Sequence, residues 1–126
     1  MSKASYDKER ALKKQVESAR KHLLDKKFDK AINELKSVLK HDTQRNDLFL
    51  EARFYLGVSY LDSNQPLLSI KQFCIMIQIK PDYKHLAYLI LSLAYRRVNQ
   101  HSHAIKVLTK GLKYFAKVSE MYLVRG

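Results

Sequence analysis

Glycine and proline are scarce in this sequence, with only three glycines and two prolines among 126 residues. Sandwiches and barrels need a turn about every ten residues, and these are the residues that make such turns. Hydrophobic residues make up 46% of the chain and charged residues 29%, a balance typical of a soluble globular domain rather than a disordered one. The composition therefore predicts an all-α protein that is long enough to bury a core.

Cysteine is also nearly absent, since Cys74 is the only one in the sequence. It has no second thiol with which to form an intramolecular disulfide, and the sequence has no Asn-x-Ser/Thr site for glycosylation. The first eight residues are polar and of mixed charge, unlike a signal peptide. The longest apolar stretch, 86–95, is about half the length that spans a bilayer. We therefore expect a cytoplasmic protein in a reducing compartment, without a membrane span.

Acidic residues are half as frequent as basic ones, because 12 Asp and Glu face 24 Lys and Arg, for a net charge of +12. An excess of this size attracts polyanions, acidic peptides or acidic membrane surfaces. The imbalance is concentrated in residues 63–119, where nine basic residues meet a single acid, a net charge of about +8. This excess either forms a solvated face or binds an acidic protein surface or nucleic acid.

Small residues recur at a nearly constant interval along the chain. Ala31 and Ser69 are 38 residues apart, and Ser69 and Ala104 are 35 residues apart. The extra residues of the first interval fall in the polar segment 42–47. The three motifs are Phe28-x-x-Ala31, Pro66-x-x-Ser69 and His101-x-x-Ala104. Small residues at such positions allow two helices to approach each other closely, so the interval predicts repeated helix pairs.

Further positions fit the same repeat: Leu56-Gly57-x-x-Tyr60, Leu91-Ser92-x-x-Tyr95, Phe73 and Pro81. The pattern resembles the tetratricopeptide repeat (TPR), in which W-x2-L-G-x2-Y is followed by A-x3-F and then P over 34 residues. Three copies follow from this resemblance, at about 12–45, 50–83 and 85–118, although none has the signature tryptophan. The resemblance implies a TPR-type α-solenoid of antiparallel helix pairs in a single domain, 1–126.

The repeat and the hydrophobic periodicity predict about seven helices. Their expected ranges are 3–26, 28–41, 46–62, 67–80, 82–98, 102–116 and 118–126. Residues 119–126 line up with the start of a fourth repeat or with a truncated capping helix. We therefore expect the chain to be a fragment of a longer repeat protein, or its exposed end to pair with another chain.

No catalytic or cofactor-binding motif is present, and we expect the protein not to be an enzyme. The sequence has no glycine-rich phosphate loop, no Cys-x-x-Cys and no His-Glu-x-x-His. His101-x-His103 lies in an expected turn without a nearby acid or thiol, which argues against a metal site. Cys74 lies among apolar residues and is expected to be buried and inert, and His22 is expected to be a packed, satisfied histidine. No cofactor is expected.

The resemblance to TPR proteins implies a binding groove, because the first helix of each pair in that family lines a concave face that commonly binds peptides. Carried over position by position, this groove combines an apolar stripe with an arginine edge. Arg20, Arg96 and Arg97 would meet acidic groups of an apolar helical or extended protein segment. The groove residues are Val16, Arg20, Leu23, Phe54, Val58, Leu61, Leu89, Leu93, Arg96 and Arg97.

Two other readings of the surface remain open. In the first, a dimer mate closes the groove, and the chain is a self-associating structural module of a larger assembly, for example a cytoskeletal or ciliary one. Alternatively, a lysine-rich outer face binds polyanions or is simply solvated. That face has no interleaved aromatic residues, so nucleic acid is not the favoured partner. Its residues are Lys71, Lys106, Lys110, Lys113 and Lys117.

One TPR subtype can be tested directly. Co-chaperone TPR domains hold the acidic C-termini of heat-shock chaperones in a clamp of Lys, Asn, Asn, Lys and Arg. Only one of the equivalent residues is basic, and it replaces an Asn: Val16, Arg20, Tyr55, Leu86 and Ile90. We therefore expect no binding of a labelled chaperone-tail peptide in fluorescence anisotropy, and micromolar affinity would contradict this expectation.

Overall fold

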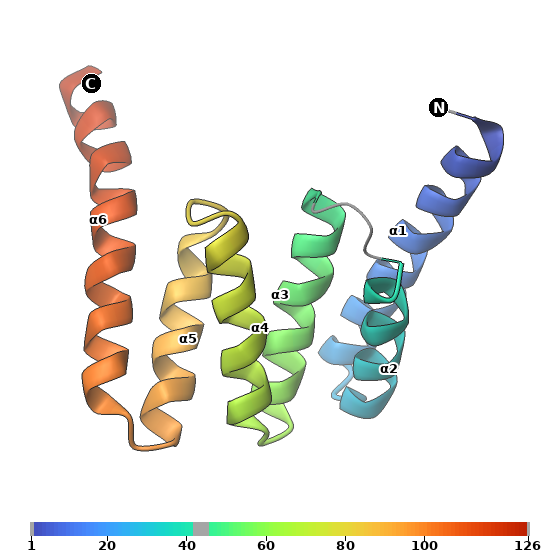
Figure 1. The fold of residues 1–126 in the computed structure, drawn as a ribbon, viewed down its shortest axis with the longest axis horizontal. Coiled ribbons are helices and arrows are strands. Elements are labelled where there is room, and N and C mark those ends of the chain that lie inside the picture. Colours follow the sequence, from blue (N-terminus) through green and yellow to red (C-terminus); the bar gives the residue numbers. More distant parts are fainter. Residues whose placement is uncertain (1, 42–45, 126) are drawn as a thin grey trace. The chain divides into compact units, whose positions relative to one another are not determined.

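The computed structural model describes the backbone of residues 2–41 and 46–125 and the side chains of residues 2–41 and 46–116. Within these residues it has six α-helices and no strand, and its fold is all-α with TPR-type helix pairs, as predicted (Figure 1). The helices are α1 (Lys3–Leu24), α2 (Phe28–Leu39), α3 (Asp47–Asp62), α4 (Pro66–Ile79), α5 (His85–Arg97) and α6 (His101–Arg125). None of these helices, over the described residues, is long and apolar enough to cross a membrane.

The last helix differs from the expectation of a break near residue 117. Helix α6 continues without interruption to Arg125, so the segment expected as a separate helix at 118–126 extends α6. Residues 112–125 contain neither glycine nor proline, so nothing there interrupts the ladder of backbone hydrogen bonds. The start of a fourth helix pair is therefore not formed within the described residues.

The turns within the three successive helix pairs share one geometry. Lys26, Asn64 and Asn99 each adopt a left-handed backbone conformation, with φ of 60°, 65° and 61°. In every case the N–H of this residue donates to the carbonyl three residues before it, and the next N–H reaches back five residues. These bonds satisfy the last free carbonyls of the preceding helix, and asparagine tolerates the conformation better than most residues. The three residues lie 38 and 35 positions apart, the interval that the sequence motif predicts.

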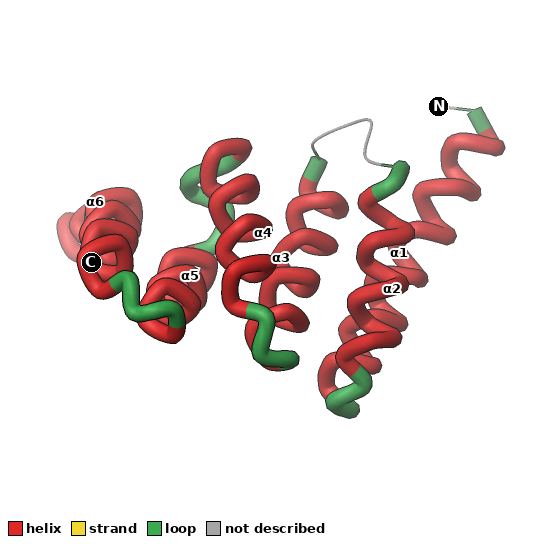
Figure 2. The backbone as a smooth tube through the Cα atoms, turned by 60° about the horizontal axis from the view of Figure 1, so that its bottom comes forward, coloured by secondary structure: helices red, strands yellow, loops and turns green. Residues whose placement is uncertain are grey.

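The chain divides into two compact units, residues 1–65 with α1–α3 and residues 66–126 with α4–α6. The helices of the expected second repeat, 50–83, belong to different units: α3 to the first and α4 to the second. Within each unit, the course of the chain through its helices can be followed in Figure 2.

In the first unit, α1 packs against α2, and α3 covers both. Ala19 of α1 and Ala31 of α2 have no exposed surface, so the two helices approach each other at the small residues that the repeat predicts. His22 contacts the carboxylate of Glu34, and Gln15 donates from Nε2 to the Glu34 carbonyl at 3.1 Å. The apolar core of this unit consists of Val16, Ala19, Ala31, Ile32, Leu35, Val38, Phe49, Ala52, Leu56 and Tyr60.

In the second unit, α5 packs against α4 on one side and against α6 on the other. Ser92 and Ala104 are 4% and 3% exposed and are the small residues that the repeat places in α5 and α6. Phe73 and Met76 of α4 are almost completely buried, as are Ala87, Leu91 and Ala94 of α5. Helix α5 is therefore the central helix of this unit.

Leu35 offers a test of the first unit's core, because its side chain is 0% exposed in α2. We expect Leu35→Ala to lower the free energy of unfolding by about 2–5 kcal/mol, through lost burial and the cavity that remains. The matched control is Leu24→Ala, since Leu24 is 69% exposed in α1 and should change it by less than about 0.5 kcal/mol. Urea denaturation followed by circular dichroism measures both, and equal losses would contradict this description of the core.

Candidate functional site

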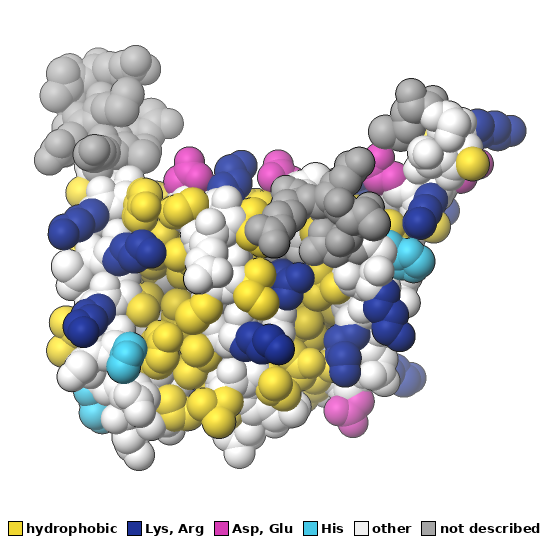
Figure 3. Space-filling model, in the orientation of Figure 1, with side chains coloured by type: hydrophobic (Ala, Val, Ile, Leu, Met, Phe, Trp, Pro, Cys, Tyr) yellow, Lys and Arg dark blue, Asp and Glu magenta, His cyan; other side chains and the backbone are white. Residues whose placement is uncertain are grey.

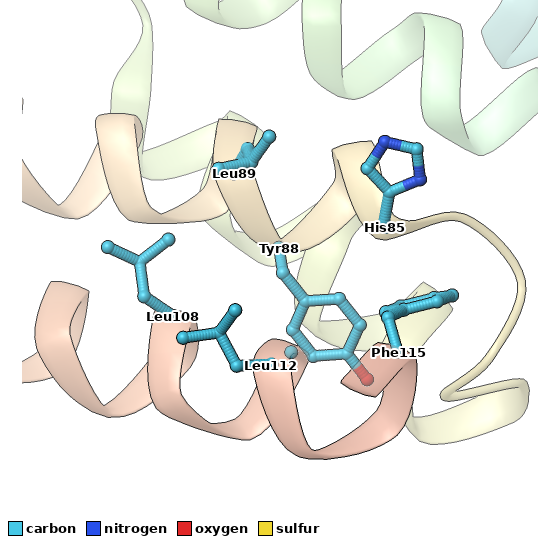
Figure 4. A pocket seen from close by; sticks show the side chains of 7 residues that line it. His85, Tyr88, Leu89, Leu108, Leu112 and Phe115 are labelled. Atoms are coloured by element: carbon cyan, nitrogen blue, oxygen red, sulfur yellow. The ribbon is translucent and has the colours of Figure 1, made fainter. Parts of the chain in front are cut away.

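A cavity of about 410 Å³ opens between α5 and α6 in the second unit. Figure 4 shows Tyr88 and Phe115 at one end of it, and Leu108 and Leu112 along the side formed by α6. The lining is almost entirely apolar and consists of His85, Tyr88, Leu89, Leu108, Gly111, Leu112 and Phe115. Most small-molecule and peptide sites are concave and apolar in this way, so we examine it as the candidate site.

Aromatic rings form one end of the cavity. Tyr88 lies edge-on to Phe115 with 6.1 Å between ring centroids, and His85 lies edge-on to Phe115 at 5.8 Å. The hydroxyl of Tyr88 donates to the carbonyl oxygen of Pro81 at 2.6 Å, which fixes the ring in place. Burial raises the pKa of Tyr88, and the charges of Tyr114 and Asp82 act in the same direction. The phenol therefore stays neutral and acts as part of an apolar wall.

Gly111 allows α5 and α6 to pack closely at the cavity. A Cβ atom at this position would lie 2.8 Å from both Cβ and Cγ of Tyr88. Those atoms belong to the base of the tyrosine side chain, which cannot swing away as a flexible tip could. The absence of a side chain at Gly111 is thus what lets Tyr88 pack directly against the backbone of α6.

Large apolar side chains are exposed at the cavity and further along the same two helices. Leu89 and Leu112, which line the cavity, are 46% and 70% exposed. Leu93, one helical turn after Leu89, and Ile105, three residues before Leu108, are 48% and 65% exposed. Single exposed leucines are common, but these four lie along two packed helices, and we call them the apolar patch. Such patches on soluble proteins usually mark a surface that another molecule covers.

A positive charge lies beside this patch on α5, at Arg96, while Asp82 is close enough to Tyr88 to act on its pKa. Residues 85–116 contain no Asp or Glu, but Lys106, Lys110 and Lys113 lie on the side of α6 away from Leu108 and Leu112. Arg96 follows Leu89 by seven residues, two helical turns, and so lies on the same side of α5. Arg96 forms no ion pair with any side chain that the structure describes. The patch is therefore apolar at its centre and basic at its edge.

The ten groove residues predicted from the sequence differ widely in exposure. Val16, Phe54 and Leu61 are buried, and Val16 belongs to the core of the first unit. Leu23 and Val58 are half-buried. In contrast, the four residues of α5 are all exposed: Leu89, Leu93, Arg96 and Arg97. Of the predicted groove, the α5 portion is the part available to a partner.

Arg20, the remaining groove residue, already has a partner. Its guanidinium donates to the carboxylate of Glu17 through Nη2 at 2.5 Å and through Nε at 3.3 Å. This hydrogen bond lowers the pKa of Glu17 and raises that of Arg20. A ligand carboxylate at Arg20 would have to compete with Glu17, whereas Arg96 of α5 forms no ion pair with a described side chain.

The predicted lysine-rich face is exposed wherever its side chains are described. Lys71 of α4 and Lys106, Lys110 and Lys113 of α6 are exposed, and the side chain of Lys117 lies outside the described residues. Figure 3 shows basic side chains over α6, while hydrophobic side chains gather over α4 and α5. The three α6 lysines lie three and four residues apart and thus share one side of the helix.

The histidines and the cysteine of the second unit take part in packing contacts. His103 stacks on Tyr95 with 5.3 Å between centroids, and the Tyr95 hydroxyl lies 3.6 Å from the sulfur of Cys74. Burial, with the neighbouring Cys74, raises the pKa of Tyr95 to about 12. Cys74 is half-buried rather than fully buried. Among the described residues no three His, Cys, Asp or Glu side chains come together as metal ligands.

The sequence-based groove omits most of the cavity lining, including Leu108, Gly111 and Leu112 of α6. These residues recur at helical spacing, and such periodicity is ordinarily a sign of core residues. Their exposure depends on whether another helix covers them, which the local pattern does not reveal. The repeat is the sequence signal that could have identified these lining residues, because it gives their equivalents in an earlier helix pair.

Two solved structures have a similar fold. One is a crystal structure of MamA, a TPR-like protein, with a TM-score of 0.75, 22% identity, and coverage of 84% of this chain and 59% of the MamA chain. A mutant of MamA gives a TM-score of 0.69, 19% identity, and coverage of 79% and 52%. The alignments thus span less than two thirds of the MamA chains. No family model and no curated protein sequence matches the chain. The likeness to MamA shows the fold alone.

Gly111 provides a test of the packing at the cavity. Alanine is the better helix former by about 1 kcal/mol, so propensity alone favours a more stable Gly111→Ala variant. The close approach of Tyr88 predicts the opposite, a net loss of about 1–3 kcal/mol from overpacking. Thr109→Ala, at an exposed position of the same helix, is the control and should not destabilise the protein. A higher melting temperature for Gly111→Ala than for the unmodified chain would show that the close contact is absent.

Proposed function

We propose that this chain is a non-enzymatic protein-interaction module or scaffold that binds a helical or extended segment of another protein. The observation that supports this most strongly is the open apolar cavity between α5 and α6, with the exposed Leu89 and Leu112 in its lining and Arg96, which pairs with no described side chain, on the same side of α5 as Leu89. Burying such side chains releases about 25 cal/mol for each Å² of apolar surface. The TPR-like fold agrees with this proposal, since helical repeats commonly serve as binding scaffolds.

The partner segment should combine apolar side chains with acidic ones. Leu89 and Leu93 offer apolar contact, and Arg96 and Arg97 follow them at the C-terminal end of α5. Guanidinium groups bind carboxylates through paired hydrogen bonds, which adds direction to an otherwise apolar contact. The single cysteine and the absence of an N-glycosylation site favour an intracellular setting.

Charge reversal at the two arginines tests this function. We expect Arg96→Glu/Arg97→Glu to lose partner proteins that the unmodified chain retains in affinity capture followed by mass spectrometry, because like charges would then face the acidic segment. Lys106→Glu/Lys113→Glu is the matched control, with the same change of charge on α6, and it should retain most of those proteins.

Two results would contradict this function. One is an identical set of retained proteins for the unmodified chain and both variants. The other is that the unmodified chain retains no more proteins than the bare matrix does. The two variants must first show the melting temperature of the unmodified chain, which is expected because all four positions are exposed.

Self-association is a second candidate function, favoured by the same exposed leucines. Light scattering over a concentration series distinguishes the two, since a strict monomer at all concentrations removes this candidate. A weaker third candidate is binding of polyanions through the exposed lysines Lys71, Lys106, Lys110 and Lys113. In that case affinity for RNA or acidic peptides would fall steeply as salt rises.

A further inference from the structure

We propose that the open face of α5 and α6 binds one acidic, amphipathic α-helix of a partner protein, in the way that α3 covers α1 and α2 in the first unit. The inference rests on the proposed function and specifies the occupant of that site. It follows from comparing two helix pairs of the same chain, one covered by a third helix and one open.

The two pairs can be compared residue by residue. The left-handed turn residues Lys26 and Asn99 are 73 positions apart, as are the small residues Ala31 and Ala104. The helix boundaries agree with this offset, because α1 ends at Leu24 and α5 ends at Arg97. Each residue of α5, and of α6 as far as Leu112, therefore has a counterpart 73 positions earlier in α1 or α2.

The counterparts of the cavity lining are core residues in the first unit. Leu89 corresponds to Val16, which is only 3% exposed, and Leu108 corresponds to Leu35, which is 0% exposed. Gly111 corresponds to Val38, also 0% exposed. Leu112, 70% exposed, corresponds to Leu39, which packs against the same core. Leu89 and Leu112 are thus exposed where their counterparts Val16 and Leu39 are covered, whereas Leu108 is half-buried and Gly111 is buried like its counterpart Val38.

Helix α3 is what covers them in the first unit. It packs against both α1 and α2, and it contributes Phe49, Ala52, Leu56 and Tyr60 to the same core as Val16 and Leu35. The spacing of these four residues, three, four and four, forms one ridge along a helix. In the second unit, the described helices provide no such cover, because α6 packs only against α5.

The chemistry of α3 indicates what the occupant should be. The helix combines its apolar ridge with three acids, Asp47, Glu51 and Asp62, against one base, Arg53. The open face has a basic group of its own, since Arg96 lies two helical turns after Leu89 on the same side of α5 and is exposed. A helix with an aromatic or aliphatic ridge and a negative net charge would bury the exposed leucines and pair with the arginine at the edge of the face.

A peptide derived from α3 is the probe. It has the sequence of residues 46–63 with Leu50→Gln, Phe54→Gln and Leu61→Gln, which removes apolar side chains outside the ridge and keeps the acids. A control peptide carries in addition Phe49→Ser and Leu56→Ser, which destroys the ridge at unchanged charge. Binding of each labelled peptide to the full chain is measured by fluorescence anisotropy at low and at physiological salt.

Two variants of the chain locate the site. Leu89→Glu and Leu112→Glu each place a carboxylate on the open face, and both residues are exposed enough for the fold to tolerate the change. Leu67→Glu is the matched control, because Leu67 of α4 is also 70% exposed and does not line the cavity. We expect roughly tenfold or greater weakening in the first two variants and less than about twofold in the control.

The outcomes separate this inference from the proposed function. Loss of binding in Leu89→Glu and Leu112→Glu but not in Leu67→Glu supports the inference, as does weaker binding of the control peptide. Equal binding in all three variants, or no binding of the probe, overturns it, although affinity capture dependent on Arg96 and Arg97 would still support an interaction module. A dimer of the unmodified chain that Leu112→Glu dissociates would identify a second copy as the occupant and would also overturn it.

Discussion

The close packing of two antiparallel helices across a short left-handed turn is the interaction on which the rest of this structure depends. Small residues allow the approach: Ala19 against Ala31 in the first unit, and Ser92 against Ala104 in the second. Each such pair buries the side where its helices meet and leaves a second apolar side to be covered. That second side is therefore exposed wherever no helix lies over it.

This chain contains both a helix pair that is covered by a third helix and a helix pair that is not. In the first unit the second side of the pair lies under α3 and forms the core around Leu35. In the second unit the equivalent side exposes Leu89 and Leu112 around an open cavity. The difference between a buried core and an exposed apolar face thus lies in the presence of one helix and not in the local sequence pattern of the pair.

The sequence predicts the helices, their order and the repeat interval, because turn residues, small residues and periodicity are local signals. It also identifies Leu89, Leu93, Arg96 and Arg97, which the structure leaves exposed. It does not predict that Val16 is buried, that Arg20 pairs with Glu17, or that Leu112 is exposed. Those properties depend on which helix covers which face and on side-chain neighbours, and neither can be read from spacing along one helix.

The most direct measurement of the central claim is methyl NMR of the chain with labelled leucines, titrated with the peptide derived from α3. Binding at the open face predicts saturable shifts of the methyl signals of Leu89, Leu108 and Leu112, while those of Leu35, in the closed core of the first unit, and of Leu67 stay in place. Shifts confined to Leu35 or Leu67, or no shifts at saturating peptide, would contradict the claim that this face is where the chain receives a helix.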